Sequence, residues 1–188
     1  MKTILMLLSF TFSFAANAQQ ASIPAIHKGT KLNYVVFANG DEVPMTVTLD
    51  SVSANYVKLG WNIGGYGSGG WVMKQPSLEK GNRNAWEQPG VGMDTELPDD
   101  QVVLLLSRAS WAALQAQKKA EIDQQVFTVG TPASGHEFAL GGKSVDALFI
   151  QNQTSGSKMW FLKQAELPVL LKIQGNAAGY DLELRSIE

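Results

Sequence analysis

Apolar and polar side chains alternate along most of this chain, and that alternation restricts its fold more than any other feature. Every second side chain is apolar in residues 31–38, 43–50 and 54–63. A period of two is typical of β-strands that bury one face and expose the other. The dipeptide Asn39-Gly40 separates the first two runs and tolerates the positive φ angles of a tight hairpin turn. The first third of the chain therefore predicts an antiparallel meander.

The last third of the chain shows the same alternation. Candidate strands, separated by short connecting stretches, cover residues 145–151, 158–163, 168–174 and 180–187. In the final run the apolar side chains from Tyr180 to Leu184 alternate with charged ones. This pattern favours a strand with one packed and one solvated face, as antiparallel sheets allow.

The middle of the chain differs from both ends. Residues 75–100 are rich in Pro, Gly, Asn and acidic residues, so we expect a long irregular connection with one helical turn. The apolar run 102–106 predicts a buried strand. Residues 107–120 predict the one real helix, because Ser107 or Ser110 can cap its N-terminus.

Together these segments predict a mainly β fold. Residues 19–188 are enough for a single antiparallel β domain with a sizeable core. We expect a strongly curved antiparallel sheet, or an open half-barrel, of about eight strands or more. One helix near residues 108–118 is expected to pack on the concave side of that sheet.

The first residues have the order of a secretory signal peptide. Lys2 precedes an apolar run over residues 4–14, and Ala16-Asn17-Ala18 supplies the small residues that a signal peptidase reads. The run is shorter than the roughly 20 apolar residues that span a bilayer. We therefore predict a signal peptide over residues 1–18 and export to the periplasm or the extracellular space. No transmembrane segment is expected after cleavage.

Composition excludes several kinds of site and partner. The chain has no cysteine, which excludes disulfides, thiol nucleophiles and thiolate metal sites. Its 15 basic and 17 acidic residues form no basic footprint, so we expect no nucleic-acid partner. With only two histidines, we also expect no metal site and no cofactor. No G-x-S-x-G motif occurs, and we assign no catalytic residue.

One acidic group leaves two alternatives open. Asp94, Glu96, Asp99 and Asp100 lie close together in the middle connection. Carboxylates are ligands that calcium prefers, although this spacing differs from an EF-hand loop. Paired carboxylates in a cleft are also the catalytic groups of glycoside hydrolysis. The alternatives are therefore calcium binding by residues 94–100 and a hydrolase that acts on envelope or dietary polymers.

A glycine-rich stretch, GWNIGGYGSGGWVMK, resembles a nucleotide-binding loop at first sight. Gly65, Gly67 and Gly70 fit the pattern G-x-G-x-x-G. A dinucleotide fingerprint needs a helix after these glycines, but residues 71–74 alternate like a strand and Pro76 follows. The kinase version needs H-R-D and D-F-G motifs, which are absent. We therefore expect a glycine-rich hairpin or bulged strand pair here and no nucleotide.

Aromatic side chains cluster in sequence around these glycines. Trp61 shares its strand face with apolar residues, so we expect it to be buried. Tyr66, Trp71 and Trp86 are the candidate ligand-binding residues, because aromatic rings stack on sugars or cover apolar ligands.

Three longer stretches together resemble a known group of proteins. They read GWVMKQPSLEKGNRNAWEQPG, ELPDDQVVLLLSRASWAAL and MWFLKQAELPVLLKIQGNAAGYDLEL. Over residues 29–187 the chain resembles a family of uncharacterised exported proteins common in Bacteroidetes, a domain of unknown function. The resemblance implies a fold and no assigned activity. More distantly, the expected architecture resembles periplasmic domains in which a curved sheet wraps a helix, a shape used by lipoprotein carriers.

These observations favour a non-catalytic exported binding module over an enzyme. The expected partner is an apolar or amphipathic small molecule, a lipid or another protein of the envelope. Carbohydrate binding through Tyr66, Trp71 and Trp86 is an alternative that requires at least two of these rings to be exposed on one face. The hydrolase with loop carboxylates is the other alternative.

Overall fold

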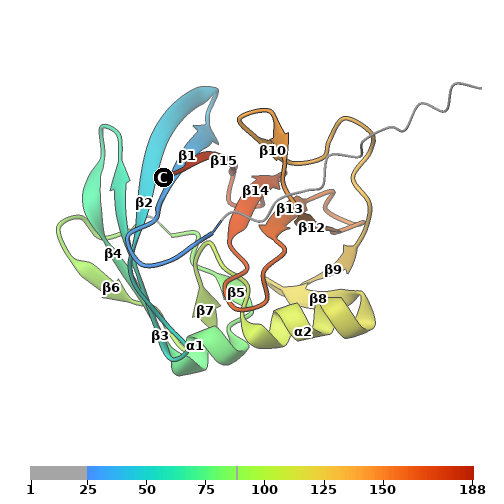
Figure 1. The fold of residues 1–188 in the computed structure, drawn as a ribbon, viewed down its shortest axis with the longest axis horizontal. Coiled ribbons are helices and arrows are strands. Elements are labelled where there is room, and N and C mark those ends of the chain that lie inside the picture. The colour runs from blue at the N-terminus through green and yellow to red at the C-terminus, as the bar shows by residue number, and fades with distance from the viewer. Residues whose placement is uncertain (1–24, 88) are drawn as a thin grey trace, which may run out of the picture.

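One large β-sheet contains strands from both ends of the chain (Figure 1). The computed structural model describes residues 25–87 and 89–188. The expected signal peptide over residues 1–18 and the expected mature start lie outside the described residues. No helix within the described part of the chain is long and apolar enough to cross a membrane.

Eleven strands form the sheet. They are β1 Lys31–Ala38, β2 Asp41–Ser53, β3 Tyr56–Ile63, β4 Gly67–Lys74, β6 Asp94–Glu96, β8 Lys119–Ile122, β9 Gln125–Val129, β12 Ala147–Gln151, β13 Lys158–Leu162, β14 Leu170–Gln174 and β15 Tyr180–Ile187. Their order is β6-β4-β3-β2-β1-β15-β14-β13-β12-β9-β8, so the sheet does not close on itself. All neighbours pair antiparallel except β4 and β6, which run parallel.

Shorter elements complete the described chain. They are the helices α1 Gln75–Lys80 and α2 Arg108–Gln117, the strand pair β5 Arg83–Asn84 and β7 Gln101–Val102, and the strand pair β10 Ala139–Leu140 and β11 Lys143–Ser144. The two helices lie together along one side of the molecule in Figure 1. The predicted mainly β fold is confirmed, but a fully antiparallel sheet is not, because β6 pairs parallel to β4. The helical turn expected in residues 75–100 is confirmed as α1, a second helix besides α2.

The hairpin prediction at the start of the sheet is confirmed. Strand β1 covers the predicted residues 31–38, and Asn39 and Gly40 turn the chain with φ angles of 55° and 89°. Asn and Gly are the residues that adopt this left-handed conformation most readily.

The predicted strand over residues 102–106 is wrong, although its residues are buried as expected. Strand β7 ends at Val102, and Leu104 has a positive φ of 55° that interrupts extended structure. Leu105 forms only an isolated bridge with Val169. A continuous apolar run predicts burial but not backbone conformation, and here these residues are buried in an irregular segment.

Helix α2 begins as predicted and ends earlier than predicted. The Ser107 hydroxyl accepts a hydrogen bond from the Ser110 amide, which satisfies an amide at the start of the helix. The helix ends at Gln117 because Lys118 adopts a left-handed conformation with φ of 59°. Leu114 is fully buried and attaches the helix to the core.

A tyrosine joins two distant strands inside the core. Tyr34 of β1 is 2% exposed, and its hydroxyl donates a 2.7 Å hydrogen bond to the carbonyl oxygen of Leu170 in β14. Burial raises the pKa of Tyr34 far above its ordinary value, because the phenolate would lose its hydration.

The glycine-rich stretch forms the β3–β4 hairpin, as predicted. Its glycines also allow a second segment to pack directly on the backbone of β4. A Cβ atom on Gly69 would lie 2.7 Å from the carbonyl oxygen of Met93 and 2.8 Å from that of Gly90. These separations are shorter than any ordinary contact, so a side chain at this position would push the 90–93 loop away.

Gly69→Ala should therefore destabilise the protein by about 1–3 kcal/mol, the usual range for overpacking a close contact. Urea unfolding followed by tryptophan fluorescence measures the loss. Ser68→Ala, at the exposed neighbouring position of β4, is the matched control and should change stability little. Equal stability of the two variants would show that the loop does not need this glycine.

Candidate functional site

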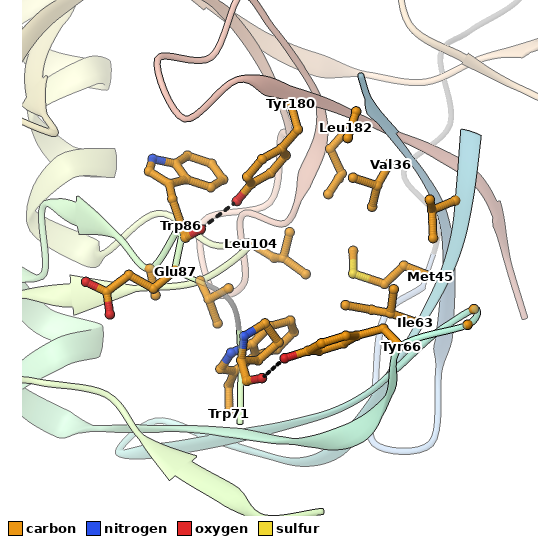
Figure 2. A pocket seen from close by; sticks show the side chains of 17 residues that line it. Val36, Met45, Ile63, Tyr66, Trp71, Trp86, Glu87, Leu104, Tyr180 and Leu182 are labelled. Atoms are coloured by element: carbon orange, nitrogen blue, oxygen red, sulfur yellow. Dashed lines mark hydrogen bonds between the residues drawn. The ribbon is translucent and has the colours of Figure 1, made fainter. Parts of the chain in front are cut away.

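A cavity of about 480 Å³ lies between one face of the sheet and the loop that contains Trp86 (Figure 2). Its 17 lining residues come from β1, β2, β15, the β3–β4 hairpin and the loops around Trp86 and Leu104. Most of them are aliphatic or aromatic. Ligand-binding pockets commonly have volumes of about 300–1,000 Å³ and mainly apolar walls. The volume and the lining are therefore suitable for a small apolar ligand.

The aromatic residues singled out in the sequence lie together at this cavity. Tyr66, Trp71 and Trp86 all line it. Tyr66 is 36% exposed, Trp71 is 6% exposed and Trp86 is half-buried. The structure thus brings the three candidates to one cavity, and their role in binding stays a prediction.

Trp61 contacts the rings of Tyr66 and Trp71 from outside the cavity. It is 2% exposed and does not line the cavity, which confirms the predicted burial. Its ring lies 6.0 Å from the ring of Tyr66 in a stacked arrangement and 5.8 Å from that of Trp71. Aromatic pairs at these separations contribute roughly 0.5–1.5 kcal/mol beyond their burial. Trp61 therefore fixes the two rings that face the cavity.

Two tyrosine hydroxyls hold the loop that borders the cavity. We call Ala85, Trp86, Glu87 and Pro89 the crossing segment. The Tyr66 hydroxyl donates a 2.8 Å hydrogen bond to the carbonyl oxygen of Pro89. The Tyr180 hydroxyl donates a 3.2 Å bond to that of Trp86, as the dashed lines in Figure 2 show.

Tyr180 also contacts Trp86 through its ring. The two rings meet edge to face with centroids 5.9 Å apart. Burial, and secondarily the negative charge of Asp123, raise the pKa of Tyr180 to about 12. The hydroxyl therefore keeps its proton, and its hydrogen bond to the crossing segment, throughout the neutral range.

Asp123 anchors the other side of Trp86. Its carboxylate accepts three hydrogen bonds, from the Asn84 amide at 2.6 Å, the Asn84 side chain at 2.8 Å and the Trp86 indole nitrogen at 2.8 Å. Asp123 lies in the tight turn between β8 and β9 with a positive φ of 52°. The carboxylate thus orients Trp86 at the edge of the cavity.

Sequence reasoning missed both Asp123 and Tyr180 as parts of this site. The pair Asp123-Gln124 is a weak turn signal, and nothing in the local pattern places it beside Trp86, which is 37 positions away. Tyr180 was expected only as a strand residue, and its distance of 94 positions from Trp86 hides the contact.

The acidic group in the middle connection does not converge on the cavity, because none of its members is a lining residue. Three of its carboxylates form separate ion pairs on the surface: Asp94 with Lys58 at 2.7 Å, Glu96 with Lys74 at 2.7 Å and Asp100 with Arg83 at 3.1 Å. Asp99 is exposed. Within residues 25–87 and 89–188, no group of three or more His, Asp or Glu side chains is placed to hold a metal ion. This arrangement gives the hydrolase and calcium alternatives no support.

Asp123→Asn should loosen Trp86. The asparagine side chain has only one acceptor oxygen, and its NH2 group would face the N–H donors of Asn84 and Trp86. The free energy of unfolding should fall by about 1–3 kcal/mol, the usual cost of losing charge-assisted hydrogen bonds. Asparagine tolerates the positive φ, so the backbone contributes little to this loss. Urea unfolding measures the change. Glu121→Gln removes the same charge from the exposed face of β8 and should leave stability unchanged, and the prediction fails if both variants behave alike.

Tyr34 and Tyr180 should ionise only at high pH. Tyr34 and Tyr180 have raised pKa values, whereas unfolding returns both to the ordinary value near 10. The folded state therefore holds these protons more tightly, so its stability is complete below pH 10 and falls as the pH rises through about 12. Ultraviolet absorbance of the phenolates, measured together with urea unfolding, tests this. Tyr180→Phe should remove one late-ionising group, and the absence of any phenolate formation above about pH 10 would contradict the prediction.

Comparison with protein-family models, with curated proteins and with solved structures gave no match to this chain. The family resemblance drawn from its sequence therefore stays a prediction.

Proposed function

We propose that this protein is a non-catalytic binding module that holds an apolar or amphipathic ligand in the cavity beside Trp86. The observation that carries the proposal is the cavity itself, whose wall of aliphatic and aromatic side chains is assembled from segments far apart in the sequence. The space is partly open to solvent, and concave sites with mainly apolar walls are where small ligands usually bind.

The apolar wall follows directly from the strand register. Val36 of β1 pairs with Val43 of β2 on one side and with Leu182 of β15 on the other. Ala38 pairs with Tyr180 in the same way. Paired residues on neighbouring strands point to the same face, so these side chains form one continuous surface.

We further propose that the sheet curves around this surface as the wall of an open half-barrel. The support is the sheet order, in which five strands follow one another as β4-β3-β2-β1-β15. Each of them contributes to the same lining, and β3 does so through its last residue, Ile63. An apolar ligand that covers this wall would gain roughly 25 cal/mol for each Å² removed from water.

The predicted signal peptide supports a location outside the cytoplasm, in the periplasm or the extracellular space. An apolar molecule has low solubility there, and a protein that encloses it would carry or sense it. A protein of the envelope that inserts an apolar side chain into the cavity is the alternative occupant.

Carbohydrate binding has less support than apolar binding. A sugar platform needs at least two rings exposed on one face, and Trp71 is 6% exposed while Trp86 is half-buried. Of the three candidates, only Tyr66 is exposed.

Removing an aromatic wall should weaken binding. N-phenyl-1-naphthylamine, an uncharged fluorescent probe, should bind the purified protein. Trp86→Ala should bind it at least about tenfold more weakly, because the substitution removes an aromatic ring that lines the cavity. A tenfold loss of affinity equals about 1.4 kcal/mol. Trp111→Ala is the control, because Trp111 is a half-buried tryptophan of α2 that does not line the cavity.

Native mass spectrometry of protein purified from its host provides an independent test. Bound hydrophobic material that is released by delipidation would agree with the proposal. Absence of such material, together with no probe binding by the unchanged protein, would refute it.

A further inference from the structure

The chemistry of the cavity wall narrows the class of ligand, on the basis of the function proposed above. The lining residues that the structure describes include no Lys, Arg or His. The one acidic lining residue, Glu87, is exposed, and Figure 2 shows its carboxylate directed away from the side chains that surround the cavity. No charged group of these residues is therefore placed to meet a charged ligand inside.

Three of the four side-chain O–H and N–H donors on the lining residues are already engaged, and the indole N–H of Trp71 is the fourth. The hydroxyl protons of Tyr66 and Tyr180 are directed to carbonyl oxygens of the crossing segment. The indole N–H of Trp86 is bonded to Asp123. Each hydroxyl oxygen still has a lone pair, so these two tyrosines can accept a hydrogen bond from a ligand but have no proton left to donate.

Two backbone donors at the glycine turn are engaged in the same way. The Gly64 amide donates to the carbonyl oxygen of Pro44 at 2.9 Å, and the Tyr66 amide donates to that of Ile63 at 3.1 Å. A carboxylate or phosphate needs donors or a cation when it leaves water, and its transfer without them costs several kcal/mol. The described lining residues supply no cation, and these engaged amides and hydroxyls supply no donor.

We propose that the cavity selects an uncharged apolar molecule whose polar end is a hydrogen-bond donor, such as a long-chain alcohol, and discriminates against fatty acids and other anionic amphiphiles. The hydroxyl of such a ligand would donate to the oxygen of Tyr66 or Tyr180, while its chain covers the aliphatic wall. A protonated amine would also lose hydration without gaining a carboxylate inside the cavity.

Three ligands with the same chain length test this selectivity. Decanol, decanoate and decylammonium are titrated into the purified protein at neutral pH, with binding followed by calorimetry and by tryptophan fluorescence. Decanol should bind most tightly, and each ion should bind at least about tenfold more weakly. Decanoate or decylammonium that binds as tightly as decanol would overturn the inference while leaving the proposed function intact. Failure of all three ligands and of the uncharged probe would overturn the proposed function itself.

Two variants separate the interior from the rim. Glu87→Gln should keep the same order of affinities for the three ligands. If this variant no longer discriminated against decanoate, the selectivity would come from the exposed charge of Glu87, and the inference would be overturned. Ala38→Lys places an ammonium group at the half-buried end of β1 that lines the cavity, so decanoate should bind about tenfold more tightly than to the unchanged protein. An unchanged decanoate affinity in a folded Ala38→Lys protein would also overturn it. If Ala38→Lys does not fold, the order of the three ligands on the unchanged protein decides alone.

Discussion

The antiparallel pairing of β1 with β15 is the contact on which the rest of the architecture depends. It runs from Leu32 opposite Ile187 to Ala38 opposite Tyr180 and joins the first strand of the sheet to the last. The N-terminal strands pair among themselves on one side of it, and the strands that follow α2 pair on the other. Closing so long a loop costs chain entropy, which the buried faces of both strands must offset. Without this pairing the cavity would lose one wall, because Tyr180 and Leu182 lie on β15.

Sequence predicted the strands whose boundaries are set locally. Every second side chain is apolar in residues 31–38, residues 180–184 alternate cleanly, and β1 and β15 have the predicted bounds 31–38 and 180–187. The run 102–106 could not be resolved in the same way, because a continuous apolar run is compatible with any buried backbone. The expected helix over 107–120 also extended too far, since Lys119–Ile122 is β8 and its pairing with β9 overrides helix propensity.

The residues of the candidate site also differ in whether local sequence predicts their position. Tyr66 and Trp71 belong to one hairpin, so a local pattern of glycines and aromatic residues was sufficient to place them together. Trp86 reaches the same cavity only because Asp123 and Tyr180 hold it there. Those two contacts join distant parts of the chain, and alternation within a strand contains no information about them.

The contacts that keep the cavity open also determine its chemistry. An apolar wall exposed to water would be stabilised if the crossing segment collapsed onto it. The hydrogen bonds from Tyr66 and Tyr180 and the bonds accepted by Asp123 oppose that collapse, because each fixes a backbone or indole position at the edge of the space. Since the same bonds use the hydroxyl protons of Tyr66 and Tyr180 and the indole proton of Trp86, the edge of the cavity that they support is left with acceptors and apolar surface. Under the proposed function, the preference for an uncharged ligand is therefore a consequence of how the cavity is supported and requires no additional residue.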